Sequence, residues 1–89
     1  MLKLIGFEFL ENIYSSTKGE LTLTDLYKKD IASWTTLNIY AKKFIEHGLI
    51  IFEVQGRKRF LRLTNKGTDV YNELKDIRAL IISVIKESL

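Results

Sequence analysis

The sequence predicts a single domain with a mostly helical α+β fold, and three observations support this prediction. The chain has 89 residues, of which 46% are hydrophobic, which is enough for one packed core. Helix signals occur in four segments of the chain. Two short runs rich in β-branched and aromatic residues follow the third of these segments. The predicted order is therefore helix, helix, helix, strand, strand, helix.

The first predicted helix covers residues 2–15. Its polar side chains share one narrow sector of the helical wheel: Glu8, Glu11, Asn12 and Ser15. Apolar side chains cover roughly 200° of the remainder, about twice the apolar face of an ordinary surface helix. We therefore expect this helix to pack against two partners. A loop over residues 15–19 and one short strand around Leu21 should follow it.

The second and third predicted helices lie close together in the chain. Thr22 is placed to cap a short helix that ends near Asp30, and Asp25 gives it an acidic first turn. Ser33 is placed to cap a helix that runs to His47, and Gly48 follows as a stop signal. Apolar residues recur at helical spacing in this third helix: Leu37, Tyr40, Ala41, Phe44 and Ile45. The first four of these are its expected inward positions.

Two predicted strands, residues 49–54 and 59–64, flank a turn in which Gly56 can adopt a positive φ. Thr64 is then placed to cap a final long helix. Its apolar positions alternate spacings of four and three, as in a coiled-coil seam: Val70, Leu74, Ile77, Ile81 and Val84. Because further apolar residues widen this stripe, residues 68–89 are predicted to form a dimerisation helix within the single domain 1–89.

Two pieces of the chain resemble the winged helix-turn-helix regulators of the MarR type and their archaeal relatives. The first is LTLTDLYKKDIASWTTLNIYAKKFIEHGLI, residues 21–50, and the second is LRLTNKG, residues 61–67. The matching features are Thr22, Leu26, the cluster Ser33-Trp34-Thr35-Thr36, Phe44 and Gly48-Leu49-Ile50. The resemblance implies a winged helix-turn-helix fold with N- and C-terminal dimerisation helices. It also implies a homodimer that binds double-stranded DNA and regulates transcription.

The chain departs from this family pattern at one turn. Such families commonly have a glycine between the second and third helices, where this sequence reads Asp30-Ile31-Ala32. This turn sets the angle of the third helix relative to the second, so that angle is the feature of the family fold that the departure affects.

The third helix, residues 33–47, is the expected recognition helix in the major groove. Asn38 is the expected base reader, because a carboxamide pairs bidentately with adenine. Thr35 and Ile39 suit thymine methyl groups, while Ser33 and Lys42 suit phosphates. Thr36 completes the outward set. Trp34 has two open interpretations, packing against the second helix or contacting DNA.

The turn between the strands is the second expected contact, as a wing over residues 54–60. Arg57, Lys58 and Arg59 follow Gly56 and are placed to enter the minor groove or bind its phosphates. Residues 28–66 hold nine basic and three acidic side chains, although the net charge of the whole chain is only +3. This uneven distribution indicates a face suited to a polyanion. Lys28 and Lys29 fit either phosphate contact or stabilisation of a helix end.

Several classes of function are not supported by the sequence. The chain has no Cys and one His, His47, so it lacks the residues for a disulfide or a metal cluster. It shows no nucleophile–histidine–acid set and no Gly-rich phosphate loop, so we expect neither an enzyme nor a cofactor. Glu8 and Glu11 interrupt the N-terminal apolar stretch, and no apolar run is long enough to span a bilayer. We therefore expect a cytoplasmic protein with no membrane partner; the sequence marks no small-molecule effector site.

Two alternatives to a specific regulator stay open at this stage. One is an architectural, chromatin-type DNA-binding protein with little sequence preference. The other is a winged helix used for protein–protein contacts. The apolar side chains of Trp34 and Ile39 are compatible with this alternative, whereas the polar side chains of Asn38, Lys42 and Lys43 argue against it.

Overall fold

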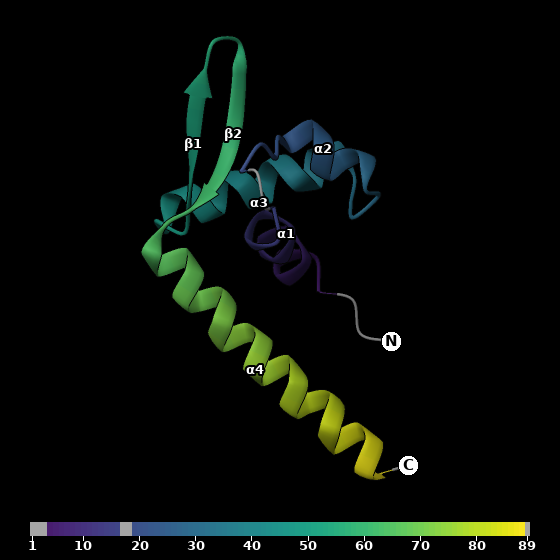
Figure 1. Ribbon diagram of the computed structural model, residues 1–89. Helices are drawn as coiled ribbons and strands as arrows, with labels where there is room; N and C mark the ends of the chain where they lie inside the picture. The colour runs from purple at the N-terminus through teal and green to yellow at the C-terminus, as the bar shows by residue number, and fades with distance from the viewer. Residues whose placement is uncertain (1–3, 17–18, 89) are drawn as a thin grey trace.

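The computed structural model describes residues 4–16 and 19–88 (Figure 1). In chain order its elements are α1 (Ile5–Tyr14), α2 (Leu23–Lys28), α3 (Trp34–Glu46), β1 (Ile50–Gln55), β2 (Lys58–Leu63) and α4 (Asn65–Ser88). This confirms the predicted order and the mostly helical α+β class. The first two positions of the predicted N-terminal helix, residues 2 and 3, lie outside the described residues. Figure 1 shows α1, α2, α3 and the hairpin gathered at one end, with α4 extending away from them.

Side-chain caps determine where α2, α3 and α4 begin. Thr22 and Asp25 form a reciprocal capping box at α2. The Ser33 Oγ accepts a hydrogen bond from the Thr36 backbone N–H at 3.2 Å. The Thr64 Oγ1 accepts one from the Gly67 N–H at 2.9 Å and donates one to the Gly48 carbonyl at 2.6 Å. Thr64 thereby joins the start of α4 to the end of α3.

The turn between α2 and α3 uses an aspartate where a glycine was expected. Asp30 has a φ of 58°, in the left-handed region. Aspartate enters this region more readily than most residues because its short polar side chain can bond locally. The missing glycine therefore does not prevent a tight turn, and Ile31 directly after it is buried in the core.

The core is built around α1, which lies between α3 and α4. Phe9 is fully buried and meets Phe44 of α3 edge-on, with ring centroids 5.3 Å apart. Phe7 stacks on Tyr71 of α4 at 5.5 Å. The two partners that the wide apolar arc predicts are therefore α3 and α4 of the same chain.

The sheet is an antiparallel hairpin in which Ile50 pairs with Leu63 and Gln55 pairs with Lys58. The short strand expected around Leu21 was wrong, since the sheet has two strands within the described part of the chain. What remains of the expected pairing is one hydrogen bond, from the Leu61 N–H to the Leu21 carbonyl at 2.7 Å. The Arg62 guanidinium donates hydrogen bonds to the Gly19 carbonyl oxygen and to the Glu53 carboxylate.

The last helix leaves the body after its first turns. Gly67 and Tyr71 are buried, and a Cβ at Gly67 would overlap the Leu49 carbonyl oxygen. Farther along, large apolar side chains are exposed: Ile77, Leu80, Ile81, Ile82, Val84 and Ile85. The molecule is consequently elongated, with a long dimension of 51 Å. The helix does not fold back over its own domain (Figure 1).

Candidate nucleic-acid interface

One side of α3 is built into the core and the other faces solvent. Leu37 and Ala41 are buried. Five of the predicted DNA-contacting side chains are exposed on the opposite side: Trp34, Thr35, Asn38, Ile39 and Lys42. Ser33 is also exposed at the cap, and Thr36 is half-buried. The spacing of apolar residues therefore separates an inward from an outward face, as the sequence predicts.

Hydrogen bonds within α3 order its first turns. The Ser33 hydroxyl donates to the Thr36 hydroxyl at 2.9 Å. The Asn38 Nδ2 donates to the Trp34 carbonyl at 2.8 Å. An asparagine amide has two N–H donors and one acceptor. This bond therefore leaves Asn38 with a second N–H and its Oδ1 for a base edge.

Trp34 packs against α2 and is also exposed to solvent. Its ring meets Tyr27 of α2 edge-on, with centroids 5.7 Å apart. The side chain is nevertheless 46% exposed, and Tyr27 is 50% exposed. Trp34 is thus held by α2 and still presents an apolar surface at the start of α3.

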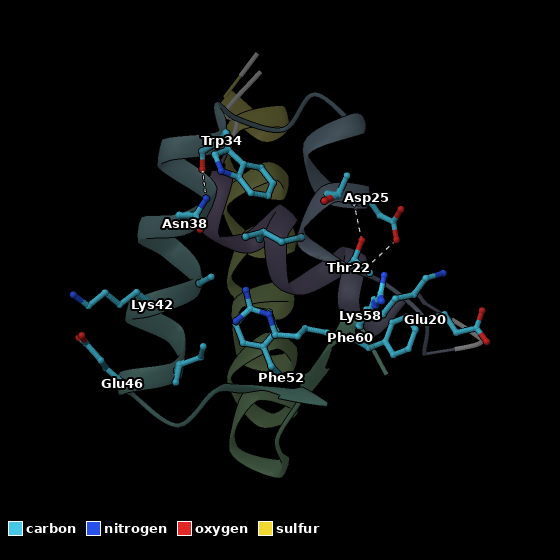
Figure 2. Close-up of a pocket in the computed structure, with 16 residues that line it drawn as sticks. Glu20, Thr22, Asp25, Trp34, Asn38, Lys42, Glu46, Phe52, Lys58 and Phe60 are labelled. Carbon is cyan, nitrogen blue, oxygen red and sulfur yellow. Dashed lines mark hydrogen bonds between the residues drawn. The ribbon is translucent and has the colours of Figure 1, made fainter. Parts of the chain in front are cut away.

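A groove of about 880 Å³ separates α2 and α3 from the hairpin. Six of the predicted DNA-contacting residues line it: Trp34, Asn38, Lys42, Arg57, Lys58 and Arg59. Figure 2 shows Trp34, Asn38, Lys42 and Glu46 in order along α3, with Thr22, Asp25 and Lys58 across the groove from them. Ser33, Thr35, Thr36 and Ile39 are not among the lining residues. The fold therefore brings the two predicted contact regions to one concave surface.

The wing cations occupy different positions along the hairpin. Arg57 follows Gly56, whose φ of 61° makes the tight turn at the tip. Arg59 lies on β2, with its guanidinium carbon 4.9 Å from the centroid of the Phe52 ring. This cation–π contact orders the Arg59 side chain beside the groove.

Three acidic residues also line the groove and were not predicted as site residues: Glu20, Asp25 and Glu46. The backbone N–H of Thr22 lowers the pKa of Asp25 below its ordinary 3.8, and the charges of Lys28 and Lys58 act in the same direction. The Glu46 carboxylate lies 3.9 Å from the Lys43 Nζ, a surface pair one turn apart. The helical wheel could have placed Glu46 beside Lys42, because the two are four residues apart. Glu20 and Phe52 come from distant segments, and no local signal identifies them.

Across residues 4–16 and 19–88, no cluster of three or more His, Cys, Asp or Glu side chains is arranged to hold a metal ion. None of the helices in this part of the chain is long and apolar enough to cross a membrane.

Comparison with known proteins gives matches at the level of structure. Neither a family model nor a curated protein sequence matches the chain. The crystal structure of AF1382 from Archaeoglobus fulgidus is similar with a TM-score of 0.76 and 25% identity, over 91% of each chain. MepR, a transcription regulator of the Staphylococcus aureus multidrug efflux pump MepA, is similar with a TM-score of 0.82 and 19% identity.

The match to MepR covers 96% of this chain and 64% of that one, so this chain spans less than two thirds of the length of MepR. A MepR–DNA complex is also similar, with a TM-score of 0.79 and 19% identity over 94% of this chain and 62% of that one. The element order, the hairpin and these likenesses agree with the predicted resemblance. The chain has the winged helix-turn-helix fold of the MarR-like regulators.

Proposed function

We propose that this chain is a sequence-specific double-stranded DNA-binding protein that regulates transcription in the cytoplasm as a homodimer, without enzymatic activity. The observation that carries the proposal is the groove, where the exposed face of α3 lies opposite a hairpin bearing three consecutive cations. A helix with its side chains is about 10–12 Å wide, which fits a major groove about 12 Å wide. The likeness to MepR in complex with DNA supports the same reading.

In this proposal each element has a separate role. Residues 33–47 enter the major groove, where Asn38 pairs with adenine. The hydroxyl of Ser33 and the ammonium of Lys42 bind phosphates. The wing, residues 54–60, places Arg57, Lys58 and Arg59 on the minor groove or the flanking backbone.

The proposed dimer forms through α4 together with the N-terminal segment, residues 2–15. Apolar side chains of α4 beyond the body of the domain are 39% to 64% exposed. A patch of this kind on a soluble domain is typical of an interface. Two-fold symmetry would present two recognition helices to a palindromic site.

Selection of bound duplexes from a random pool tests sequence specificity. We expect an enriched palindrome, because a symmetric dimer offers two identical recognition helices. Equal binding to unrelated duplexes would instead indicate an architectural protein, and no binding to any duplex would favour a winged helix used for protein contacts.

Salt dependence tests whether phosphates are bound. A dimer that neutralises about six to ten phosphates should show a slope of log K against log salt of about −5 to −9. A slope shallower than about −2 on every duplex would contradict DNA binding through these cations.

Two variants separate base contacts from phosphate contacts. Asn38→Ala should lose about 1–3 kcal/mol on the selected site and weaken the preference at one base position. Arg57→Ala combined with Arg59→Ala should weaken binding to all duplexes and reduce the salt slope. An equal loss for Asn38→Ala on selected and random duplexes would exclude Asn38 as a base reader.

A further inference from the structure

The first half of the exposed face of α3 carries no charge. Its outward side chains are Trp34, Thr35, Asn38 and Ile39, and the cations Lys42 and Lys43 begin only one turn later. Ile39 is 55% exposed and Trp34 is 46% exposed, so both keep apolar surface in contact with water. The sequence of α3, WTTLNIYAKKFIE, contains no arginine. The part of the helix that reaches base edges in this kind of motif is therefore apolar and amide-bearing.

Base pairs differ in what they offer to such a surface. The O6 and N7 acceptors of guanine are matched by arginine or lysine, which the first half of α3 lacks. Thymine presents a C5 methyl group, which apolar side chains and the threonine methyl contact, and adenine presents the pair of groups that asparagine matches. The uncharged half of α3 thus complements A·T pairs, while Lys42 and the wing cations supply the attraction to phosphates.

The edge of this surface is ordered before any ligand binds. Trp34 is held by its edge-on contact with Tyr27, and Asn38 is held by its bond to the Trp34 carbonyl. Ile39 is β-branched, so few rotamers are open to it in a helix. Little conformational entropy remains to be lost when a methyl group packs against these side chains.

We propose that α3 reads thymine methyl groups, with Ile39 and Thr35 as the apolar contacts and Asn38 on a neighbouring adenine, so that the preferred duplex is A·T-rich where α3 enters. This inference rests on the proposed function and adds the class of sequence recognised. Burying one methyl group corresponds to about a fourfold gain in affinity. Two symmetric half-sites with one buried methyl each would therefore give about sixteenfold.

The test compares two duplexes that differ only in these methyl groups. Fluorescence anisotropy at low salt measures the affinity of the full chain for an alternating A·T duplex and for the same duplex with deoxyuridine in place of every thymidine. We expect the A·T duplex to bind about fourfold to sixteenfold more tightly, because deoxyuridine keeps every hydrogen-bonding group and lacks only the methyl. Equal affinity of the unmodified protein for the two duplexes would overturn the inference without requiring any variant.

Matched variants assign the effect to a side chain. Ile39→Ala should lower the ratio of the two affinities toward one, with any remainder due to Thr35. Ile39 is exposed enough that the fold should persist, which circular dichroism checks. Lys42→Ala should weaken binding to both duplexes by the same factor and leave their ratio unchanged. An unchanged ratio in Ile39→Ala would also contradict the inference. Failure of the proposed function has a different signature, because the unmodified protein would then bind no duplex even at low salt.

Discussion

At the scale of single residues, Asp30 determines how the chain turns from α2 into α3. Its φ of 58° lies in the region that glycine occupies without a steric penalty, and where most side chains cost about 1–2 kcal/mol. Asp30→Val should therefore lower the free energy of unfolding by about 1–2 kcal/mol. Asp30→Gly should change it by about 0.5 kcal/mol or less, because the relief of strain is offset by a more flexible unfolded chain.

Urea denaturation of the two Asp30 variants measures both effects. Asp30 is exposed, so lost packing does not enter the comparison. An Asp30→Val protein as stable as the unmodified one would show that the turn relaxes to a negative φ.

Glu46 offers a prediction about the charge of the groove. Its carboxylate lines the same groove as the wing cations, and a phosphate about 8 Å away would be repelled by about 0.5 kcal/mol in water. Glu46→Gln should therefore raise the affinity for every duplex about twofold at low salt, and the gain should shrink as salt screens the charge. Glu73→Gln, at an exposed position on α4, is the matched control because it changes the net charge equally away from the groove. An equal gain in both variants would assign the effect to net charge alone.

The residues of α3 were predictable because helical spacing determines which side chains face outward. The groove was not, because its walls come from α2, α3, the hairpin and the segment before α2. Phe52 illustrates the difference. The alternation of side chains marks Phe52 as a strand residue. Its contact with Arg59 depends on the register of the hairpin, because Arg59 pairs with Val54, which lies two residues after Phe52 on β1.

At the scale of elements, the junction between β2 and α4 depends on Gly67. In an exposed helix, Gly→Ala is stabilising by roughly 1 kcal/mol. Here the added Cβ would overlap the Leu49 carbonyl oxygen, a backbone atom that no side-chain rotation can move. Gly67→Ala should therefore destabilise the domain by about 1–3 kcal/mol.

Thermal and urea unfolding of Gly67→Ala test this expectation. Asn72→Ala, at an exposed position farther along α4, is the control and should be neutral or slightly stabilising. Stabilisation by Gly67→Ala as well would mean that α4 can move away from Leu49 at little cost.

Local signals predicted most of the elements and failed at the third strand. The caps at Thr22, Ser33 and Thr64 and the glycine after α3 set four helix ends through bonds between nearby residues. Strand pairing at Leu21 depends instead on how the segment before α2 meets β2. The neighbouring Gly19 carbonyl accepts a hydrogen bond from the Arg62 side chain instead of from a strand. The one backbone hydrogen bond left runs from the Leu61 N–H to the Leu21 carbonyl. The segment around Leu21 is too short for its hydrophobic periodicity to show whether it forms one backbone hydrogen bond or a full β-ladder.

At the scale of the whole molecule, the exposed apolar stripe of α4 predicts self-association. Sedimentation equilibrium at low micromolar concentration should give about twice the chain mass of 10.4 kDa. Ile77→Glu combined with Ile81→Glu should give the monomer mass, because two carboxylates would have to be buried in the interface. The same variant should lose affinity for the palindrome, since two half-sites would no longer be bound together.

Lys75→Glu is the control for the dimer variant. It also adds a carboxylate to an exposed position of α4, but off the seam, so the dimer should persist. A monomer mass for the unmodified chain would contradict the dimer, and so would an unchanged mass in the double variant.

The exposed end of α4 has a consequence for how the occupancy of the proposed DNA site depends on the concentration of this protein. Every side chain from Ala79 to Lys86 is exposed within one chain. Pairing of two chains would bury the apolar stripe of α4, so the folded state is stabilised by association and the temperature of thermal unfolding should rise with protein concentration. Occupancy of a two-fold site would then increase with the square of the supply of free chains, and a modest change in synthesis would become a sharp change in binding.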